Sequence, residues 1–572
     1  MSIGLNRFWS SRGRRRFLSI GLIGVTTITI IKVRKRYNDL IELDEDEDDE
    51  FIKHTNREHK KSFYHGMHHP FLTNDIEELN LFKKYYSKYD FLIGNNLNEI
   101  KEKHSLKTPV KFRSIKEYKN EIIHENISTL CVGGAPALIA AVDLISNKNK
   151  NENENEKDLI YLNDFRRIPI ANGSAWHLEQ DAHTEAPTNY KPTKFLSDQL
   201  KRIFYDNIYL KDICQTGEFP WRTIDWLSWI YHPSHWYRAL KLSIQFQIFT
   251  MFNDRTNLLN DVSKQCFRNE LFFSKLNQIL NNKLLLQESG SIIIARNQQE
   301  INDLNQLKDN LIKEGRNLNI LSKETLFQRY SFIPNGLMFA EKIHDRVLVA
   351  NFQEILNNYL IEKGAKVLDG TLDTIYIDEK QSTDGGGGGG IASIKYGNGQ
   401  EKFIKFSRLI LSLGNQEIFT ENNKRLFDVV SARGVSMLAF IYLPKHYKIP
   451  PVLVCGGTNH VTNLSPQPIQ IDQNTNLFLM RFTAGACITP NISNKYTSFY
   501  DSTVAVGLLK SVKNTFPTNT KIKPIFIYGC NRQVSQYGQI NWIQPYKNIF
   551  IQYGAAGGGL TRAPDFITNF NK

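Results

Sequence analysis

The stretch that decides the fold reads Thr129-Leu-Cys-Val-Gly133-Gly134-Ala135-Pro136-Ala137-Leu138-Ile-Ala-Ala141. It joins a β-type run, Ser128–Val132, to a helix of small residues, Pro136–Ile145, and a second β-type run follows at Leu159–Leu162. Strand, helix and strand in this order predict a βαβ unit of an α/β fold. The turn lies where a dinucleotide fingerprint belongs, because such a turn lets backbone approach a pyrophosphate at the start of a helix.

The turn keeps the first glycine of that fingerprint and changes the other two positions. Gly133 stands first, Ala135 takes the second position and Leu138 the third. Alanine still lets backbone come close to a phosphate, whereas leucine is expected to hold the helix further from the sheet. The alternative is a turn of small residues that only packs. The residues expected to contact a nucleotide are Gly133, Gly134, Ala135, Pro136 and Ala137.

The end of the second strand offers the acidic group that such a site needs. A carboxylate at this point accepts hydrogen bonds from the ribose hydroxyls of the nucleotide. The run Leu159-Ile-Tyr-Leu-Asn163-Asp164 supplies Asp164, with Asn163 as the alternative if the register differs by one residue. A strand-terminal Asp that caps a turn would explain the same residue. The turn and the acid together, in this order, favour the nucleotide site.

Further along the chain, short apolar segments alternate with helical patterns. Apolar residues at helical spacing predict a helix at Val347–Lys363, and a last helix is expected from about Ala563. Two low-complexity inserts, Asn147–Lys157 and Gly385–Gly390, lie between apolar segments and are interpreted as lengthened turns. The expected strands are Lys366–Leu368, Thr374–Ile377, Leu409–Leu413, Ile525–Tyr528 and Ile549–Tyr553.

The N-terminal segment is basic and apolar. Arginines at 12 and 14–16 precede an apolar run, Phe17–Ile31, and lysines and arginines at 32 and 34–36 follow it. The run is short for a transmembrane helix, which needs about 20 residues, but flanking basic side chains extend its reach. With no acidic residue before Asp39, this composition predicts a membrane anchor or a mitochondrial presequence. A secretory signal is the alternative, although no small-residue cleavage site precedes the second basic cluster.

Charge and cysteine content narrow the class of protein. The net charge of +13 is spread along the chain without a zinc-finger, RNP-type or basic-zipper pattern, so we expect a membrane surface or organelle import and no nucleic acid. The six cysteines form no CxxC pair, which predicts neither a disulfide framework nor a cysteine metal site. His65, His68 and His69 have no carboxylate or cysteine partner nearby, so we expect a polar loop and no metal.

The strongest motif lies in the C-terminal tail, Asn548-Ile-Phe-Ile-Gln-Tyr-Gly554-Ala-Ala-Gly557-Gly558-Gly559-Leu560-Thr561-Arg-Ala563-Pro564. With it, the chain from about Ile127 to the C-terminus resembles the FAD-dependent amine and amino-acid oxidoreductases, a superfamily that includes D-amino-acid dehydrogenases, glycine oxidase and sarcosine dehydrogenases. The tail looks like the final strand and glycine loop that run under the flavin ring into the last helix. The resemblance therefore implies FAD contacts at Gly554, Gly557, Gly558, Gly559, Leu560 and Thr561.

Four other places in the chain share this resemblance. The stretch Tyr528-Gly529-Cys-Asn-Arg532 is similar to the family's Gly-x-Arg-Pro turn, with Gln533 in place of the proline. By that likeness Arg532 would bind a substrate carboxylate in a bidentate pair, and a surface arginine is the alternative. Ser174 occupies the place of a serine near the pyrophosphate and flavin, and Arg166 follows the second strand within reach of phosphate oxygens. Gly414 closes a strand whose backbone lies near the nucleotide.

The resemblance implies an α/β fold in which a Rossmann-like FAD-binding lobe is interleaved with an α+β substrate lobe of antiparallel sheet and helices. The N-terminal targeting or anchor segment would be 1–40, and an acidic and His-rich accessory segment would be 41–125. The FAD-binding lobe would comprise 126–215, 345–425 and 525–572, and the substrate lobe 216–344 and 426–524.

The implied activity is oxidation of a C–N bond of an amine or amino acid by hydride transfer to FAD, because the cofactor supplies the difficult chemistry. Electrons would leave to oxygen or a quinone. Two alternatives stay open. One is a non-catalytic flavin-fold assembly or scaffold protein of a mitochondrial membrane, and the other is a flavin oxidoreductase of another substrate class, such as a polyene or amine oxidase.

Overall fold

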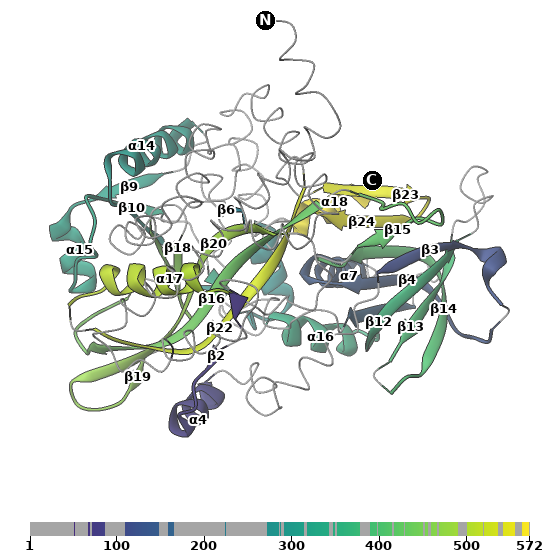
Figure 1. The fold of residues 1–572 in the computed structure, drawn as a ribbon, viewed down its shortest axis with the longest axis horizontal. Coiled ribbons are helices and arrows are strands. Elements are labelled where there is room, and N and C mark those ends of the chain that lie inside the picture. The colour runs from purple at the N-terminus through teal and green to yellow at the C-terminus, as the bar shows by residue number, and fades with distance from the viewer. Residues whose placement is uncertain are drawn as a thin grey trace, which may run out of the picture.

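The computed structural model describes a large part of the chain, and the statements below concern that part. The described residues are 51, 67–68, 71–85, 109–119, 121–147, 158–164, 223–224, 271–284, 286–287, 291–313, 317–342, 347–348, 352–377, 389–396, 398–414, 417–427, 429–449, 452–455, 459–465, 468–489, 500–518, 520–535, 541–554 and 563–570. They form two lobes, each built around a large β-sheet (Figure 1).

The first lobe contains a nine-stranded sheet with a parallel centre. Its parallel strands lie in the order β12-β5-β4-β14-β24, so the first of them along the chain is central and the order reverses between β4 and β14. The parallel strands are β4 (Ile123–Gly133), β5 (Leu159–Asp164), β12 (Lys366–Ile377), β14 (Glu401–Ser412) and β24 (Ile549–Tyr553). The same sheet includes β3 (Val110–Ser114), β13 (Gly390–Lys395), β15 (Ile418–Phe419) and β23 (Asn541–Tyr546).

Helices cover one face of this sheet, and an antiparallel meander covers the other. The helices are α7 (Ala135–Asn147), α16 (Phe352–Glu362) and α18 (Ala563–Phe570), and α7 contacts both of the others. The meander is formed by β12, β13 and β14. The central strands are apolar on both faces, as expected of parallel strands buried between two layers. In β4, for example, Cys131 points into the helix-side core, whereas Leu130 and Val132 point into the meander-side core.

The second lobe contains an eleven-stranded, mainly antiparallel sheet. Its order is β2-β22-β16-β20-β18-β17-β8-β10-β9, with β19 and β6 paired to β20. The strands are β2 (Phe71–Leu72), β6 (Thr223–Ile224), β8 (Ser291–Ala295), β9 (Leu318–Leu321), β10 (Met338–Lys342), β16 (Val429–Pro444), β17 (Val452–Cys455), β18 (Asn459–Asn463), β19 (Ile469–Gln470), β20 (Thr475–Thr489) and β22 (Lys521–Ser535). Two small sheets pair β1 (Met67–His68) with β21 (Tyr500–Asp501) and β7 (Leu286–Gln287) with β11 (Val347–Leu348).

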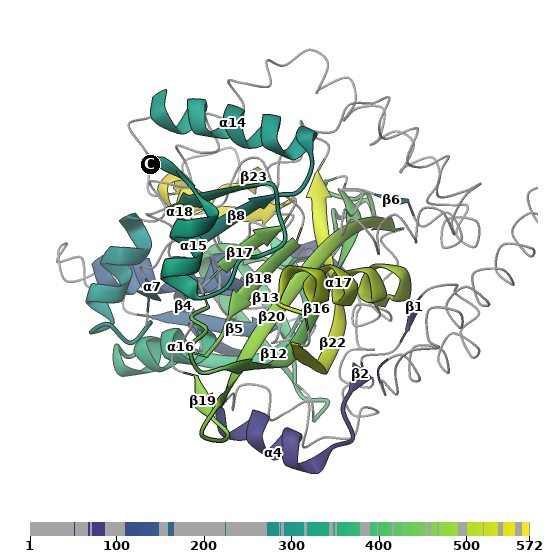
Figure 2. The ribbon, with the colours of Figure 1, turned by 90° about the vertical axis from the view of Figure 1, so that its left-hand side faces the viewer.

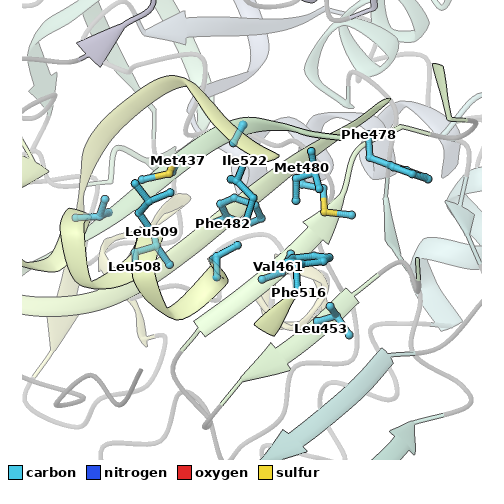
Figure 3. Close-up of a cluster of buried hydrophobic side chains, with 14 of the residues drawn as sticks. Met437, Leu453, Val461, Phe478, Met480, Phe482, Leu508, Leu509, Phe516 and Ile522 are labelled. Carbon is cyan, nitrogen blue, oxygen red and sulfur yellow. The ribbon is translucent and has the colours of Figure 1, made fainter. Parts of the chain in front are cut away.

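The core of the second lobe lies between this sheet and α17 (Ser502–Thr515), which crosses the long strands in Figure 2. Figure 3 shows part of that core, where Met437 and Phe482 of the sheet lie near Leu508 and Leu509 of the helix. The opposite face packs against α14 (Gln298–Lys313) and α4 (Ile76–Tyr85). On the α17 side α15 (Lys323–Tyr330) adds Leu326. Both faces of the long strands are therefore buried.

The architecture agrees with the expected fold class, an α/β lobe with a parallel sheet and a second lobe of antiparallel strands and helices. Several segment and helix boundaries differ from those predicted. β3 lies in the parallel-sheet lobe although 41–125 was expected to be an accessory segment, and β22 lies in the antiparallel sheet although 525–572 was expected in the FAD-binding lobe. The helix expected from Val347 begins at Phe352, because Val347–Leu348 pairs with β7.

The N-terminal segment, with the apolar run Phe17–Ile31, lies outside the described residues. Within the residues described, none of the helices combines the length and the apolar character needed to cross a membrane.

Candidate functional site at the carboxyl edge of the parallel sheet

Three neighbouring parallel strands end side by side where the strand order reverses. Gly133 of β4 pairs with Ser412 of β14, and Gln552 of β24 lies one residue beyond the pair Leu411↔Ile551, level with Ser412. In open α/β sheets, ligands bind outside the carboxyl ends of the strands at such a point of reversal. The row Gly133, Ser412 and Gln552 is therefore the candidate site.

A glycine in the left-handed region of backbone space lies at the end of β4, two residues after β14 and directly after β24. The φ angles are +112° at Gly133, +62° at Gly414 and +71° at Gly554. Glycine adopts such angles without the steric cost that a side chain brings. A glycine that can adopt such an angle therefore stands at this edge on each of the three strands.

Gly133 is also required by the close approach of β14. A Cβ atom on Gly133 would lie 2.3 Å from the carbonyl oxygen of Ser412. The next amide, Gly134 N–H, donates to that same oxygen at 2.7 Å, and the Tyr161 hydroxyl donates to the carbonyl oxygen of Gly133 at 2.7 Å. Contacts within the protein thus hold the glycine turn against β5 and β14.

Helix α7 starts at this edge and points its N-terminus toward it. The helix begins at Ala135, directly after the turn, and Leu138 N–H donates to the carbonyl oxygen of Gly134 at 2.9 Å. A helix N-terminus carries partial positive charge and attracts phosphate. Leu138, in the third fingerprint position, is only 1% exposed and packs in the core that α7 shares with α16 and α18. Its side chain is therefore part of the core between these helices and the parallel sheet.

Ser412 and Gln552 form a buried polar pair that sequence reasoning missed. The Ser412 hydroxyl donates to Oε1 of Gln552 at 2.9 Å, and the residues are 7% and 4% exposed. Among the described residues, Nε2 of Gln552 has no hydrogen-bond partner. The available signal was a polar residue at the end of each apolar run, Leu409–Leu411 and Ile549–Ile551. Only the pairing of the strands shows that the polar residues meet.

The end of β5 carries both of the residues weighed for the ribose contact. Asn163 is engaged in the protein, because its Nδ2 donates to Asp369 at 2.9 Å and its Oδ1 accepts from Gln353 at 3.0 Å. The backbone of Asp164 pairs with Gly370 of β12, and its side chain lies outside the described part of the structure. Asp164 at the end of β5 therefore stays the predicted ribose ligand.

The prediction of a turn at Arg532 is wrong. Arg532 lies inside β22, where its backbone pairs with Ala432 of β16 in the antiparallel sheet. The residues of β22 pair with β16 without a break from Tyr528 to Ser535, so the stretch Tyr528–Arg532, which resembled a turn in sequence, is part of the strand. β22 contacts β24, and the substrate role of Arg532 stays a prediction.

The remaining predicted site residues are placed as follows. Gly134, Pro136 and Ala137 lie with Gly133 and Ala135 at the junction of β4 and α7. No group of three or more His, Cys, Asp or Glu within the described ranges is placed to hold a metal ion. The predicted residues outside the described part are Arg166, Ser174, Gly557, Gly558, Gly559, Leu560 and Thr561.

The residues present fit a dinucleotide such as FAD. Its pyrophosphate needs close backbone and a helix N-terminus, which Gly133, Gly134 and the start of α7 supply. Its polar groups need hydrogen-bond donors, and the unpartnered Nε2 of Gln552 is one at the same edge. Fold and site together define a two-lobed protein with a Rossmann-like α/β lobe and an antiparallel lobe.

Comparisons with known proteins give structural likenesses alone. No family model matches the sequence, and no curated protein matches it. The chain is similar to glycine oxidase from Geobacillus kaustophilus, with a TM-score of 0.47, 12% identity and coverage of 78% of this chain and 94% of that one. It is also similar to L-proline dehydrogenase from P. horikoshii, with a TM-score of 0.46, 12% identity and coverage of 77% and 91%. For L-alpha-glycerophosphate oxidase from Mycoplasma pneumoniae with FAD bound, the TM-score is 0.43 at 12% identity, covering 78% and 93%.

Proposed function

We propose that this chain is an FAD-dependent oxidoreductase that oxidises a C–N bond of an amine or amino acid by hydride transfer to the flavin. The observation that supports it most is the reversal of strand order between β4 and β14, where a left-handed glycine lies at or within two residues of the end of β4, β14 and β24. Such an edge accepts a dinucleotide laid across the strands. The choice of FAD and of an amine substrate comes from the resemblance of the C-terminal tail to the flavin oxidoreductases.

In this proposal the chain's own residues bind and orient the cofactor. Gly133, Gly134 and the N-terminus of α7 would hold the pyrophosphate, and Asp164 would accept hydrogen bonds from the ribose hydroxyls. When bound, FAD would supply the hydride acceptor. The antiparallel lobe meets the α/β lobe where β22 contacts β24, which supports a substrate site at that boundary. Arg532 of β22 would hold a substrate carboxylate there.

The first experiment measures cofactor content and affinity. We expect the purified full-length protein to show flavin absorbance or to take up added FAD. Asp164→Asn should weaken FAD binding, because the amide keeps one acceptor oxygen, replaces the other with an NH2 donor and removes the negative charge that strengthens hydrogen bonds from the ribose hydroxyls. The matched control is Asp158→Asn, which changes an exposed acid just before the opposite end of β5. A protein that takes up no FAD would overturn the proposed function and favour the scaffold alternative.

The second experiment identifies the substrate class. Under anaerobic conditions, the flavin band of the loaded protein should bleach on addition of a D-amino acid, glycine or an N-methyl amine. Arg532→Lys should raise the KM for substrates with a carboxylate more than for amines without one, because lysine cannot form the bidentate pair. Bleaching by a polyene alone would replace the amine substrate with the other class.

We also propose that the segment 1–40 tethers the protein to a mitochondrial membrane and that a quinone or oxygen accepts the electrons. The support is the arrangement of basic clusters on both sides of Phe17–Ile31. The full chain should sediment with mitochondrial membranes, and a variant that lacks 1–40 should not. Recovery of both forms in the same soluble fraction would refute the tether.

A further inference from the structure

The amide of Gln552 is a buried polar group with one end unused. The residue is 4% exposed, and Nε2 has no hydrogen-bond partner among the described residues. Buried side-chain amides in native proteins nearly always have their hydrogen bonds made, so a single unused donor needs an explanation. A ligand acceptor that is present only in the loaded protein would supply one.

The orientation of that amide is set by the neighbouring strand. Ser412 donates its hydroxyl to Oε1 of Gln552 at 2.9 Å, and its carbonyl oxygen accepts from Gly134 N–H at 2.7 Å. Ser412 therefore connects the glycine turn to Gln552. With Oε1 occupied by the hydroxyl, the group of Gln552 that is left to bind a ligand is its NH2.

The strand order says which half of a dinucleotide lies near Gln552. β5 and β12 lie on one side of β4, whereas β14 and β24 lie on the other. A dinucleotide across the point of reversal places one half on each side. With Asp164 at the end of β5 as the predicted ligand of the adenosine ribose, β24 lies on the side of the other half.

We propose that Nε2 of Gln552 donates a hydrogen bond to the flavin half of FAD, at an oxygen of the ribityl chain or of the ring. This inference rests on the proposed function, because it takes FAD as the bound dinucleotide. Gln552 then distinguishes FAD from ligands that carry only its adenosine half. Ser412 acts as a positioning residue, since it holds the amide of Gln552 with its donor free.

The test compares the Kd of FAD with that of ADP, a probe of the adenosine half, on full-length protein freed of flavin. Gln552→Leu should weaken FAD about tenfold, the effect of losing one hydrogen bond, and should leave ADP unchanged. Gln552→Glu should weaken FAD further, because a carboxylate replaces the donor. Gln544→Leu is the matched control, an exposed Gln on the adjacent strand β23, and should change neither Kd.

The outcomes separate this inference from the proposed function. Wild-type protein that binds FAD, with Gln552→Leu binding it equally well, overturns the inference and leaves the proposed function standing. Equal losses for FAD and ADP show a structural role and also overturn it. Wild-type protein that binds neither ligand overturns both. If Gln552→Leu does not fold, the double variant Ser412→Ala/Gln552→Leu, which removes both partners of the hydrogen bond, must show the same selective loss.

Discussion

Replacing Gly133 with alanine probes the contact that anchors the candidate site. The new Cβ would lie 2.3 Å from the carbonyl oxygen of Ser412 and 2.7 Å from its carbonyl carbon, both of which are backbone atoms. The backbone angle φ of +112° is also unfavourable for alanine. The substitution therefore strains the turn and pushes β4 away from β14.

The magnitude follows from these two effects. A left-handed angle costs a residue with a side chain about 1–2 kcal/mol, and forcing an extra carbon into a packed region costs about 1–3 kcal/mol. We expect Gly133→Ala to lower the free energy of unfolding by about 2–5 kcal/mol. The hydrogen bond from Gly134 N–H to Ser412 would weaken as the strands separate, which adds to the loss.

Two control glycines isolate the contact from the backbone angle. Gly399 and Gly414 also have positive φ, +81° and +62°, but a Cβ at either position would meet no atom within 4 Å. Their alanine variants should lose only about 1–2 kcal/mol. Urea unfolding followed by tryptophan fluorescence and circular dichroism measures all of these variants. If Gly133→Ala costs no more than Gly399→Ala, then the carbonyl of Ser412 does not approach Gly133, and the described edge is wrong.

Three further predictions concern other parts of the chain. Arg329→Ala should lower the free energy of unfolding in urea by about 1–3 kcal/mol, because it leaves the nearly buried Glu341 without the guanidinium that contacts both carboxylate oxygens at 2.6 and 2.7 Å; unchanged unfolding would contradict this. Burial raises the pKa of the Cys131 thiol to about 12, so iodoacetamide near pH 8 should modify Cys131 only in unfolded protein, as peptide mass spectrometry can show. The backbone amide of Glu78 and the Lys523 side chain lower the pKa of Asp75 below its ordinary 3.8. The stability that Asp75 adds relative to Asp75→Asn is thus present at neutral pH and lost as pH falls through that lowered pKa; a difference that stays constant down to about pH 3 would refute it.

Local patterns predicted much of the α/β lobe. The strand, small-residue helix and strand around Gly133 appear as β4, α7 and β5, and the segment before Gly554 appears as β24. These elements were predictable because each depends on its own apolar run and on a terminal glycine. Prediction from local pattern fails for the start of the helix expected from Val347. Val347–Leu348 pairs with the distant strand β7, and the helix begins only at Phe352. The turn predicted at Arg532 failed for the same reason, because pairing with the distant strand β16 keeps this stretch extended.

The sequence by itself determined the βαβ opening and the glycines at or just after the ends of β4, β14 and β24, because hydrophobic periodicity and backbone freedom act within a few residues. The tertiary structure alone decided that Gly133, Ser412 and Gln552 form one row at the point where strand order reverses. Ser412 and Gln552 are 140 residues apart in sequence. The sequence of a strand does not identify the strand that will pair with it, because the backbone edge of any strand can form hydrogen bonds with that of any other. The packing of side chains on both faces of the sheet selects the partner.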